Sequence, residues 1–166
     1  RDREEASEAS KIMGVHLREN LNFADGFFAN NKNHQISIIK KIREYQPDII
    51  ITNAPSDRHP DHGRASQLTI DSTFLSGLEK INTNQAVWRP SSIYHYIQFN
   101  SLEPNIFIDI SDTFDEKLKA VKAYKSQFYD PSSSESQTVI SSKGFLESIE
   151  YRACLLYTSP SPRDSD

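Results

Sequence analysis

The residues of this sequence that could do chemistry gather in one short polar segment. The segment covers residues 53–62. Its last six positions hold two imidazoles, two carboxylates and a guanidinium, on Asp57, Arg58, His59, Asp61 and His62. A His-x-x-His spacing lets one or both imidazoles reach a metal ion, and neutral imidazole is a good zinc ligand. A catalytic zinc usually takes three protein ligands and a water, so two histidines do not complete its shell. Any further ligands must come from other segments.

The same segment has a second interpretation that involves no metal. Its His and Asp side chains could instead cap the helix that follows. The other histidines, His16, His34 and His95, are scattered along the chain, and we expect each to be a surface or strand residue rather than a ligand. Tyr94 and Tyr96 could line a sugar site by stacking, or they could be ordinary strand aromatics.

The elements around this segment predict a strand, a loop and a helix in succession. Apolar residues at helical spacing cover 33–46 and stop at Pro47, and the apolar run 48–52 is typical of a buried parallel strand. After the polar segment, helical spacing resumes from Ala65 to Leu75. Ligands of open α/β sheets bind beyond the carboxyl ends of the strands, which is where this loop is expected to lie.

The rest of the chain predicts a layered α/β domain with a largely parallel sheet, because helical and strand patterns alternate. The further predicted elements are three helices over 4–14, 112–128 and 143–153 and two strands over 93–99 and 106–110. In the first helix Met13 belongs to the apolar side and Gly14 is placed to end the helix. Thr113 and Glu116 suit a capping box for the helix over 112–128.

Composition excludes several classes of protein. The 166 residues have room for one compact domain. Lys and Arg total 19 against 23 Asp and Glu, a net charge of −4 that argues against a nucleic-acid-binding surface. No stretch approaches the roughly 20 apolar residues that span a bilayer. The single cysteine, Cys154, cannot form an internal disulfide. We therefore expect a soluble, cytoplasmic protein that binds neither nucleic acid nor membrane.

Both ends of the sequence predict an interrupted protein. The chain opens inside a helical pattern without a clear N-cap, so we expect upstream sequence to be missing. Residues 154–166 are rich in Ser and Pro and are similar to translated adapter sequence, which predicts a disordered, non-native tail. A natural flexible tail is the alternative. The domain itself is then expected over residues 1–153.

Four blocks of the sequence resemble the LmbE-like (PIG-L) zinc deacetylases. They are residues 4–14, 15–26, 57–65 with its His-Pro-Asp-His sequence, and 123–128 with its Ser-Gln pair. The similarity runs over about residues 1–153 and is closest to members that act on N-acetylglucosaminyl-malate in bacillithiol biosynthesis. It implies a Rossmann-like, three-layer domain that lacks its first strand here. It also implies zinc-dependent hydrolysis of the acetamide of an N-acetylglucosamine conjugate.

The resemblance implies roles for three residues of the polar segment. His62 matches a zinc ligand, and His59 matches the residue that stabilises the oxyanion or protonates the leaving amine. Asp61 would orient a histidine. The family's His-Pro-Asp-Asp motif, which supplies the other two ligands and the general base, has no counterpart in this sequence. We therefore predict that the 166-residue chain alone binds zinc weakly at best and does not turn over.

The substrate-binding candidates are three further residues. Arg58 is expected to bind the malyl carboxylates, because a guanidinium matches a carboxylate in bidentate fashion, with a plain surface position as the alternative. Arg18 and Gln127 are the others, with surface or packing positions as the alternative. The partner is a small sugar conjugate, and self-association is expected by analogy only. An inositol-linked substrate and a noncatalytic carbohydrate-binding protein of the same fold are the rival functions.

Overall fold

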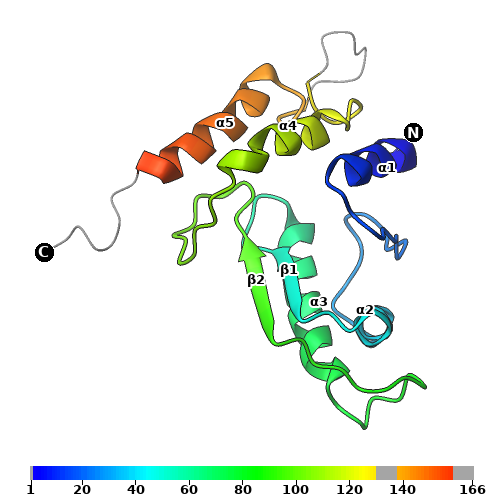
Figure 1. Cartoon of the computed structure of the whole chain (residues 1–166). Helices are drawn as coiled ribbons and strands as arrows, with labels where there is room; N and C mark the ends of the chain where they lie inside the picture. Colours follow the sequence, from blue (N-terminus) through cyan, green and yellow to red (C-terminus); the bar gives the residue numbers. More distant parts are fainter. Residues whose placement is uncertain (1, 130–137, 159–166) are drawn as a thin grey trace, which may run out of the picture. The chain divides into compact units, whose positions relative to one another are not determined.

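The computed structural model describes residues 2–129 and 138–158 (Figure 1). The chain forms two compact units, one of residues 20–107 and the other of residues 1–19 with 108–166. The first is called the sheet unit below, and the second the helical unit. Among the described residues, no helix has the length and apolar character needed to cross a membrane.

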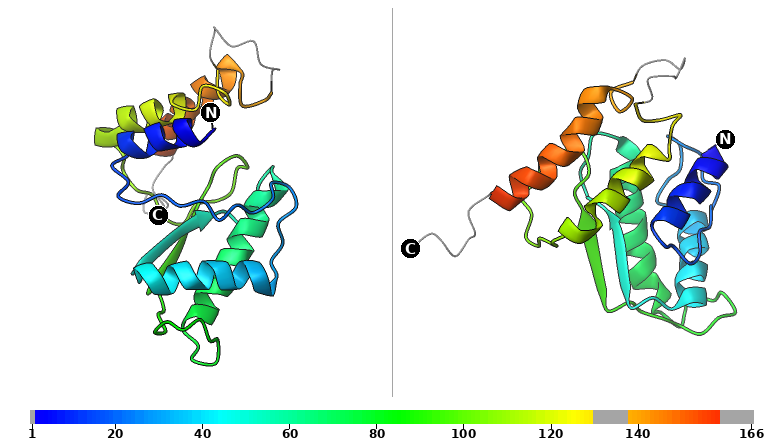
Figure 2. Two further views of the ribbon diagram at one scale, coloured as in Figure 1. Left: turned by 90° about the vertical axis from the view of Figure 1, so that its right-hand side faces the viewer. Right: turned by 45° about the horizontal axis from the view of Figure 1, so that its top comes forward.

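The sheet unit is built on two parallel strands joined through a helix. Its elements follow in the order α2 (Lys32–Tyr45), β1 (Ile49–Asn53), α3 (Pro60–Ser76) and β2 (Ser92–Tyr96). In the register of the two strands, Ile49 lies opposite Ser92 and Asn53 lies opposite Tyr96. The helix α3 packs against both β1 and α2, and Figure 2 shows the two helices side by side. The predicted α/β fold with a parallel sheet is confirmed.

The ends of α2 and the start of α3 follow from local sequence. The Asn31 side chain caps α2 by accepting a hydrogen bond of 3.0 Å from the His34 N–H. Gln46 ends α2 in the left-handed region at φ 47°, and Pro47 follows it. Pro60 occupies the first turn of α3, where the missing N–H of proline leaves no helical bond unmade. The chain is thereby turned from α2 into β1, and from the loop after β1 into α3.

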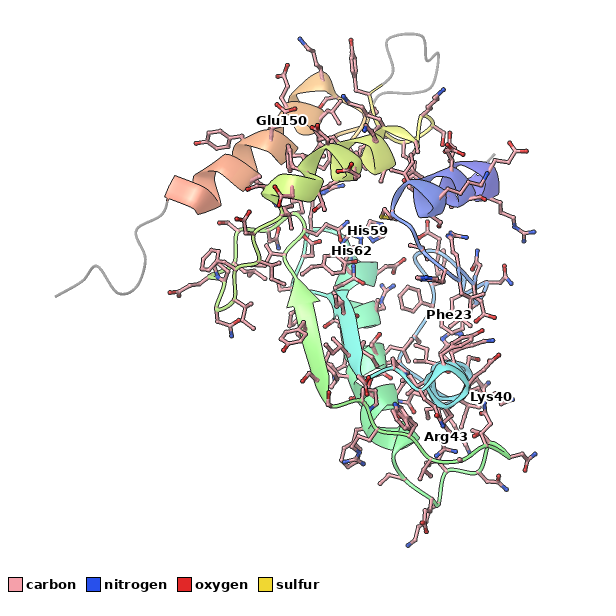
Figure 3. The ribbon with its side chains drawn as sticks, viewed as in Figure 1. Phe23, Lys40, Arg43, His59, His62 and Glu150 are labelled. Atoms are coloured by element: carbon pink, nitrogen blue, oxygen red, sulfur yellow. The ribbon has the colours of Figure 1, made fainter. Side chains whose placement is uncertain are left out.

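A buried arginine, Arg43, lies in the last turn of α2. Arg43 of α2 is 4% exposed, and its guanidinium donates hydrogen bonds to the carbonyls of Ser76, Leu78 and Ile81 at 3.0, 2.9 and 2.6 Å. A fourth bond of 2.8 Å reaches the hydroxyl of Thr83. In Figure 3 the residue lies between α2 and the segment that follows α3. Arg43 therefore joins α2 to the connection between α3 and β2.

The strand predicted over 48–52 is parallel as expected, but the prediction that it is buried is wrong for one of its faces. Thr52 is 6% exposed, but Ile49 and Ile51 are 53% and 67% exposed. Side chains alternate between the two faces of a strand, and α3, which packs against β1, leaves Ile49 and Ile51 on the uncovered face. On the other face the register places Tyr94 beside Ile51, and Tyr94 is exposed too. The continuous apolar run therefore does not mark two covered faces among the described residues.

The helical unit is assembled from α1 (Asp2–Ile12), the short 3₁₀ turn η1 (Ser111–Thr113), α4 (Phe114–Lys122) and α5 (Lys143–Thr158). The helices α1 and α4 pack together, with the small side chains of Ala6, Ala9 and Ala120 buried. Gly14 ends α1 in the left-handed region at φ 65°, as predicted. Met13, expected on the apolar side, is 56% exposed.

Several boundaries of the helical unit differ from the sequence prediction. Residues 106–110 form no strand, and Ile108 is 77% exposed, because neither described strand pairs with them. The capping box is also wrong, since Thr113 makes no side-chain cap and η1 precedes a helix that ends at Lys122 rather than at 128. The helix α5 continues past Ala153 to Thr158. The rest of the predicted tail, 159–166, lies outside the described residues.

Candidate active site

The polar segment lies where two loops of the sheet unit meet. Residues 54–59 follow β1 and residues 97–100 follow β2. The strands are parallel, so both loops leave the same, carboxyl edge of the sheet. Figure 3 shows His59 and His62 just beyond this edge, where α3 begins. Their rings are 5.3 Å apart between centroids.

His62 is held by a carboxylate. Its Nδ1 lies 2.6 Å from Oδ2 of Asp57, whose side chain is 1% exposed whereas that of His62 is 29% exposed. The other carboxylate oxygen accepts hydrogen bonds from the backbone N–H groups of Arg58 at 2.8 Å and Asn100 at 3.0 Å. Burial raises the pKa of the Asp57 carboxyl, but the bonds from His62 and from the two N–H groups outweigh burial and leave that pKa below 3.8.

His59 has the opposite arrangement of its ring. It is the N-cap of α3, and its Nδ1 accepts a hydrogen bond of 3.2 Å from the Asp61 N–H. A backbone N–H can only donate, so Nδ1 offers its lone pair and the ring proton of the neutral imidazole is on Nε2. An ionised carboxylate can only accept, so at His62 the proton is on Nδ1 and Nε2 of the neutral ring carries the lone pair. At Nε2, His59 therefore presents an N–H donor, whereas His62 presents a lone pair that can bind a metal.

Asp61 joins the start of α3 to the loop before α2. Its Oδ2 accepts a hydrogen bond of 2.6 Å from the N–H of Gly26, and Oδ1 forms an ion pair with Arg64. The Arg64 guanidinium also donates to the Gly26 carbonyl at 2.9 Å. The hydrogen bond from Gly26, opposed by burial and assisted by the charge of Arg64, keeps the pKa of the Asp61 carboxyl below 3.8.

One group of possible metal ligands occurs among the described residues. Asp25, His59 and Asp61 bring one ligand atom each to within 4.8 Å of one another. Both oxygens of Asp61 are already bonded to Gly26 and Arg64, which leaves it a poor ligand. The free Nε2 of His62 is instead suited to zinc, which binds the neutral imidazole nitrogen. The group of possible ligands that the structure brings together therefore does not include His62, and the role of His62 as a zinc ligand stays a prediction.

The structure gives the substrate-binding candidates different surroundings. Arg58 is exposed, and its guanidinium lies 5.0 Å from the ring centre of Phe99, on the loop that follows β2. Arg18 and Gln127 are exposed residues of the helical unit, so their roles stay predictions. In the segment that carries Gln127, Ser126 donates to the Glu5 carboxylate from its N–H at 3.0 Å and its hydroxyl at 2.5 Å.

Sequence reasoning missed several residues of the site. Asn100 and Asp25 are distant in sequence from the polar segment, and only the Asp-Gly turn at 25–26 was a local signal. Tyr96 receives a hydrogen bond of 2.8 Å from Asn53 at the same edge of the sheet. Burial and the negative charge of Asp57 raise the pKa of the Tyr96 phenol above 10.0. Tyr96, which sequence reasoning did name, thus lies at the carboxyl edge of the sheet near Asp57, and its stacking on a sugar stays a prediction.

Comparisons with known proteins relate this chain to deacetylases. Residues 1–73 match the model of the GlcNAc-PI de-N-acetylase family, PIG-L. The diacetylchitobiose deacetylase of Thermococcus kodakarensis is 32% identical over 130 residues, which are 75% of this chain and 49% of that protein. The chain thus spans about half the length of this curated relative. These matches support a relationship to the PIG-L deacetylases.

Solved structures share the fold. The conserved protein TT1542 from Thermus thermophilus superposes with a TM-score of 0.74 at 32% identity, over 76% of this chain and 57% of that one. The N,N'-diacetylchitobiose deacetylase from Pyrococcus horikoshii, complexed with its inhibitor MPG, gives a TM-score of 0.69 over 93% of this chain and 55% of that one. At 24% identity this second likeness concerns the fold alone.

Proposed function

We propose that this chain is part of a zinc-dependent N-deacetylase that hydrolyses the acetamide of an N-acetylglucosamine conjugate. The observation that carries the proposal is that two histidines three residues apart have opposite tautomers. Nε2 of His62 carries a lone pair that can bind a metal, and Nε2 of His59 carries a proton that can be donated to an oxyanion. A loop that only capped α3 would need His59 alone and would not need a buried carboxylate behind His62.

The chemistry asks for both kinds of group. Amide hydrolysis adds one water to the acetyl carbon, and the C–N bond then breaks to give acetate and the free amine of the sugar. Zinc, when bound at His62, supplies an activated water and polarises the carbonyl. The N–H of His59 would stabilise the oxyanion, an interaction typically worth about 3–4 kcal/mol. Asp61 contacts His59 through its N–H and holds the first turn of α3 to Gly26.

We further infer that the substrate carries an acidic aglycone, as N-acetylglucosaminyl-malate does. Arg58 is exposed at the rim of the site, beside the ring of Phe99. A guanidinium there can bind a carboxylate in bidentate fashion. The diacetylchitobiose deacetylase of Thermococcus kodakarensis supports an N-acetylated sugar as the reacting part. It leaves the aglycone open, so an inositol-linked sugar and diacetylchitobiose are the competing substrates.

The test uses the longest open reading frame that contains this chain, assayed for free amine with zinc and each of the three substrates. We expect the malate conjugate to be deacetylated and His62→Ala to reduce the rate to background. His59→Ala should lower kcat about 10²- to 10³-fold. The matched control is His16→Ala, an exposed histidine outside the metal-ligand group, which should keep full activity.

Arg58→Ala separates the substrate from the chemistry. It should raise KM for the malate conjugate about 10- to 100-fold, because a charge-assisted hydrogen bond is lost, and leave kcat nearly unchanged. An unchanged KM would assign the acidic aglycone to other residues. Turnover that survives His62→Ala would contradict the role of His62 as a zinc ligand. Sugar binding with no turnover of any substrate would favour the noncatalytic carbohydrate-binding protein.

A further inference from the structure

We propose that Asp57 is a positioning residue that fixes the ring orientation and the tautomer of His62. The proposal rests on the proposed function only for what the free Nε2 binds. The arrangement itself is a property of this chain and can be measured without substrate or metal. Sequence reasoning had given the task of orienting a histidine to Asp61, four residues further along the chain.

The contact between the two side chains is short and sheltered. His62 Nδ1 lies 2.6 Å from Asp57 Oδ2, and the Asp57 side chain is 1% exposed. Water therefore has little access to the carboxylate and does not compete well for it. With an acceptor on Nδ1, the neutral ring keeps its proton there and leaves Nε2 bare. A metal or an electrophile can approach only on that side of the ring, and the His62 side chain as a whole is 29% exposed.

The carboxylate is itself immobilised by the backbone on both sides. Oδ1 accepts from the Arg58 N–H, in the loop after β1, and from the Asn100 N–H, in the loop after β2. Two donors on Oδ1 and one on Oδ2 leave the carboxylate no freedom to rotate. The direction of the His62 ring is thereby tied to both loops at the carboxyl edge of the sheet. A surface carboxylate that happened to lie near a histidine would not be bonded in this way.

Asp61 does not compete for this role at His62. Its two oxygens bond Gly26 and Arg64, and its N–H bonds His59. The neighbouring Arg58 side chain lies over Phe99 rather than on Asp57. Asp57 is therefore the carboxylate that the structure assigns to His62. Such partners of metal-binding histidines typically change metal affinity about 10- to 100-fold when removed.

The test reads the tautomer directly in the 166-residue chain. Long-range ¹H–¹⁵N spectra are recorded without metal at about pH 8, where an imidazole of ordinary pKa is neutral. The His62 signals are assigned by their loss in His62→Gln. We expect the Nδ1–H tautomer in the wild type and a shift toward Nε2–H in Asp57→Asn, because the new amide can donate to Nδ1.

Two variants separate positioning from general structure. Asp57→Glu keeps an accepting carboxylate and should retain the Nδ1–H tautomer, including in the case where Asp57→Asn fails to fold. Asp71→Asn alters an acid of α3 that is bonded to Asn30 and Gln67, and it should leave His62 unchanged. Zn²⁺ titration of the product of the longer reading frame should give an affinity about 10- to 100-fold weaker for Asp57→Asn.

The outcomes distinguish this inference from the proposed function. A wild-type His62 in the Nε2–H tautomer, or an Asp57→Asn chain that folds and keeps Nδ1–H, overturns the positioning role whatever the enzyme assay shows. The expected tautomers combined with no deacetylation of any of the three substrates by the wild-type protein would instead leave the positioning role standing and remove the deacetylase proposal.

Discussion

A charge inside a protein is stable only when its hydrogen bonds are complete, and Arg43 shows this at the scale of one residue. Its guanidinium serves three carbonyls and one hydroxyl from a position that is 4% exposed. We expect Arg43→Ala to lower the free energy of unfolding by about 3 kcal/mol, because several buried acceptors lose their donor. Arg43→Lys should recover only part of it, since an ammonium lacks the planar fork.

The measurement is urea unfolding followed by far-UV circular dichroism. The control is Lys40→Ala, on the same helix and exposed, which should change the free energy of unfolding by less than about 0.5 kcal/mol. Figure 3 labels both residues. Equal stability of Arg43→Ala and wild type would mean that the segment after α3 does not depend on this guanidinium.

Asp109 gives a dependence on pH that can be assigned to one group. Its Oδ1 accepts from the Ser111 hydroxyl at 2.6 Å and from the Ser111 N–H at 2.9 Å, and these bonds hold the pKa of Asp109 below 3.8. A lowered pKa stabilises the fold above the unfolded value and loses that effect as pH falls through the folded value. Asp109→Ala should therefore lower Tm slightly at pH 7, and the difference from wild type should shrink as the pH falls below 3.8.

Thermal melts of the two proteins between these pH values test the assignment. Glu79→Gln, which alters an exposed acid of the sheet unit, serves as the control and should show no such convergence. A Tm difference between Asp109→Ala and wild type that stays constant with pH would show that the contact acts through packing and not through ionised Asp109.

The sequence located the chemistry of the site better than its contacts. The block 57–62 could be found because its residue types and spacing are local, and the structure places it beyond β1 as predicted. The partner of His62 could not be found, because both Asp57 and Asp61 are within reach in sequence. Only the fold decides which carboxylate is hydrogen-bonded to Gly26 and which to His62. Asn100 belongs to another loop, and no local pattern announces a backbone donor.

At the scale of elements, the first turn of α3 is set by a close approach of backbone to backbone. A Cβ placed on Gly63 would lie 2.9 Å from the Pro55 carbonyl oxygen, and backbone cannot move aside as a side chain can. Gly63→Ala should lower the free energy of unfolding by about 1–3 kcal/mol. It should also shift His59 and His62, which flank this turn, and so reduce the proposed deacetylase activity of the product of the longest reading frame that contains this chain.

Gly144→Ala is the matched control for this substitution. Gly144 also lies in the first turn of a helix, α5, and a Cβ there would meet nothing within 4 Å. Alanine at this position should keep or raise stability, by up to about 1 kcal/mol. Equal behaviour of the two variants would mean that the contact with Pro55 relaxes freely.

Strands were predicted less well than helices because a strand exists only through its partners. The predicted strands over 48–52 and 93–99 pair with each other as β1 and β2. The segment 106–110 has a similar apolar run but pairs with neither. The helix α2 needed only its own spacing, its cap at Asn31 and the stop at Pro47. The failed capping box at Thr113 had the right residues, but η1 changes the backbone where the cap would form.

At the scale of the whole molecule, the chain spans about half of its curated relative, and the described residues offer part of a metal shell. One imidazole with a free nitrogen, beside the bonded carboxylates of Asp57 and Asp61, should bind zinc weakly. With a dissociation constant of about 10–100 μM, 100 μM Zn²⁺ would stabilise the chain by about 0.4–1.4 kcal/mol. For a chain of this size that corresponds to a rise in Tm of roughly 1–5 °C.

Differential scanning calorimetry with and without Zn²⁺, reversed by EDTA, measures this directly on the 166-residue chain. His62→Gln should abolish the rise, because it removes the imidazole that Asp57 orients, whereas His16→Gln should not. A rise above about 10 °C in the wild type would require several ligands acting together. Asp61 would then have to give up its bonds to Gly26 and Arg64. Together with Asp25 and His59 it would join His62 on the metal. A small rise that depends on His62 alone instead places the remaining ligands outside the described residues, and with them the groups that complete the catalyst.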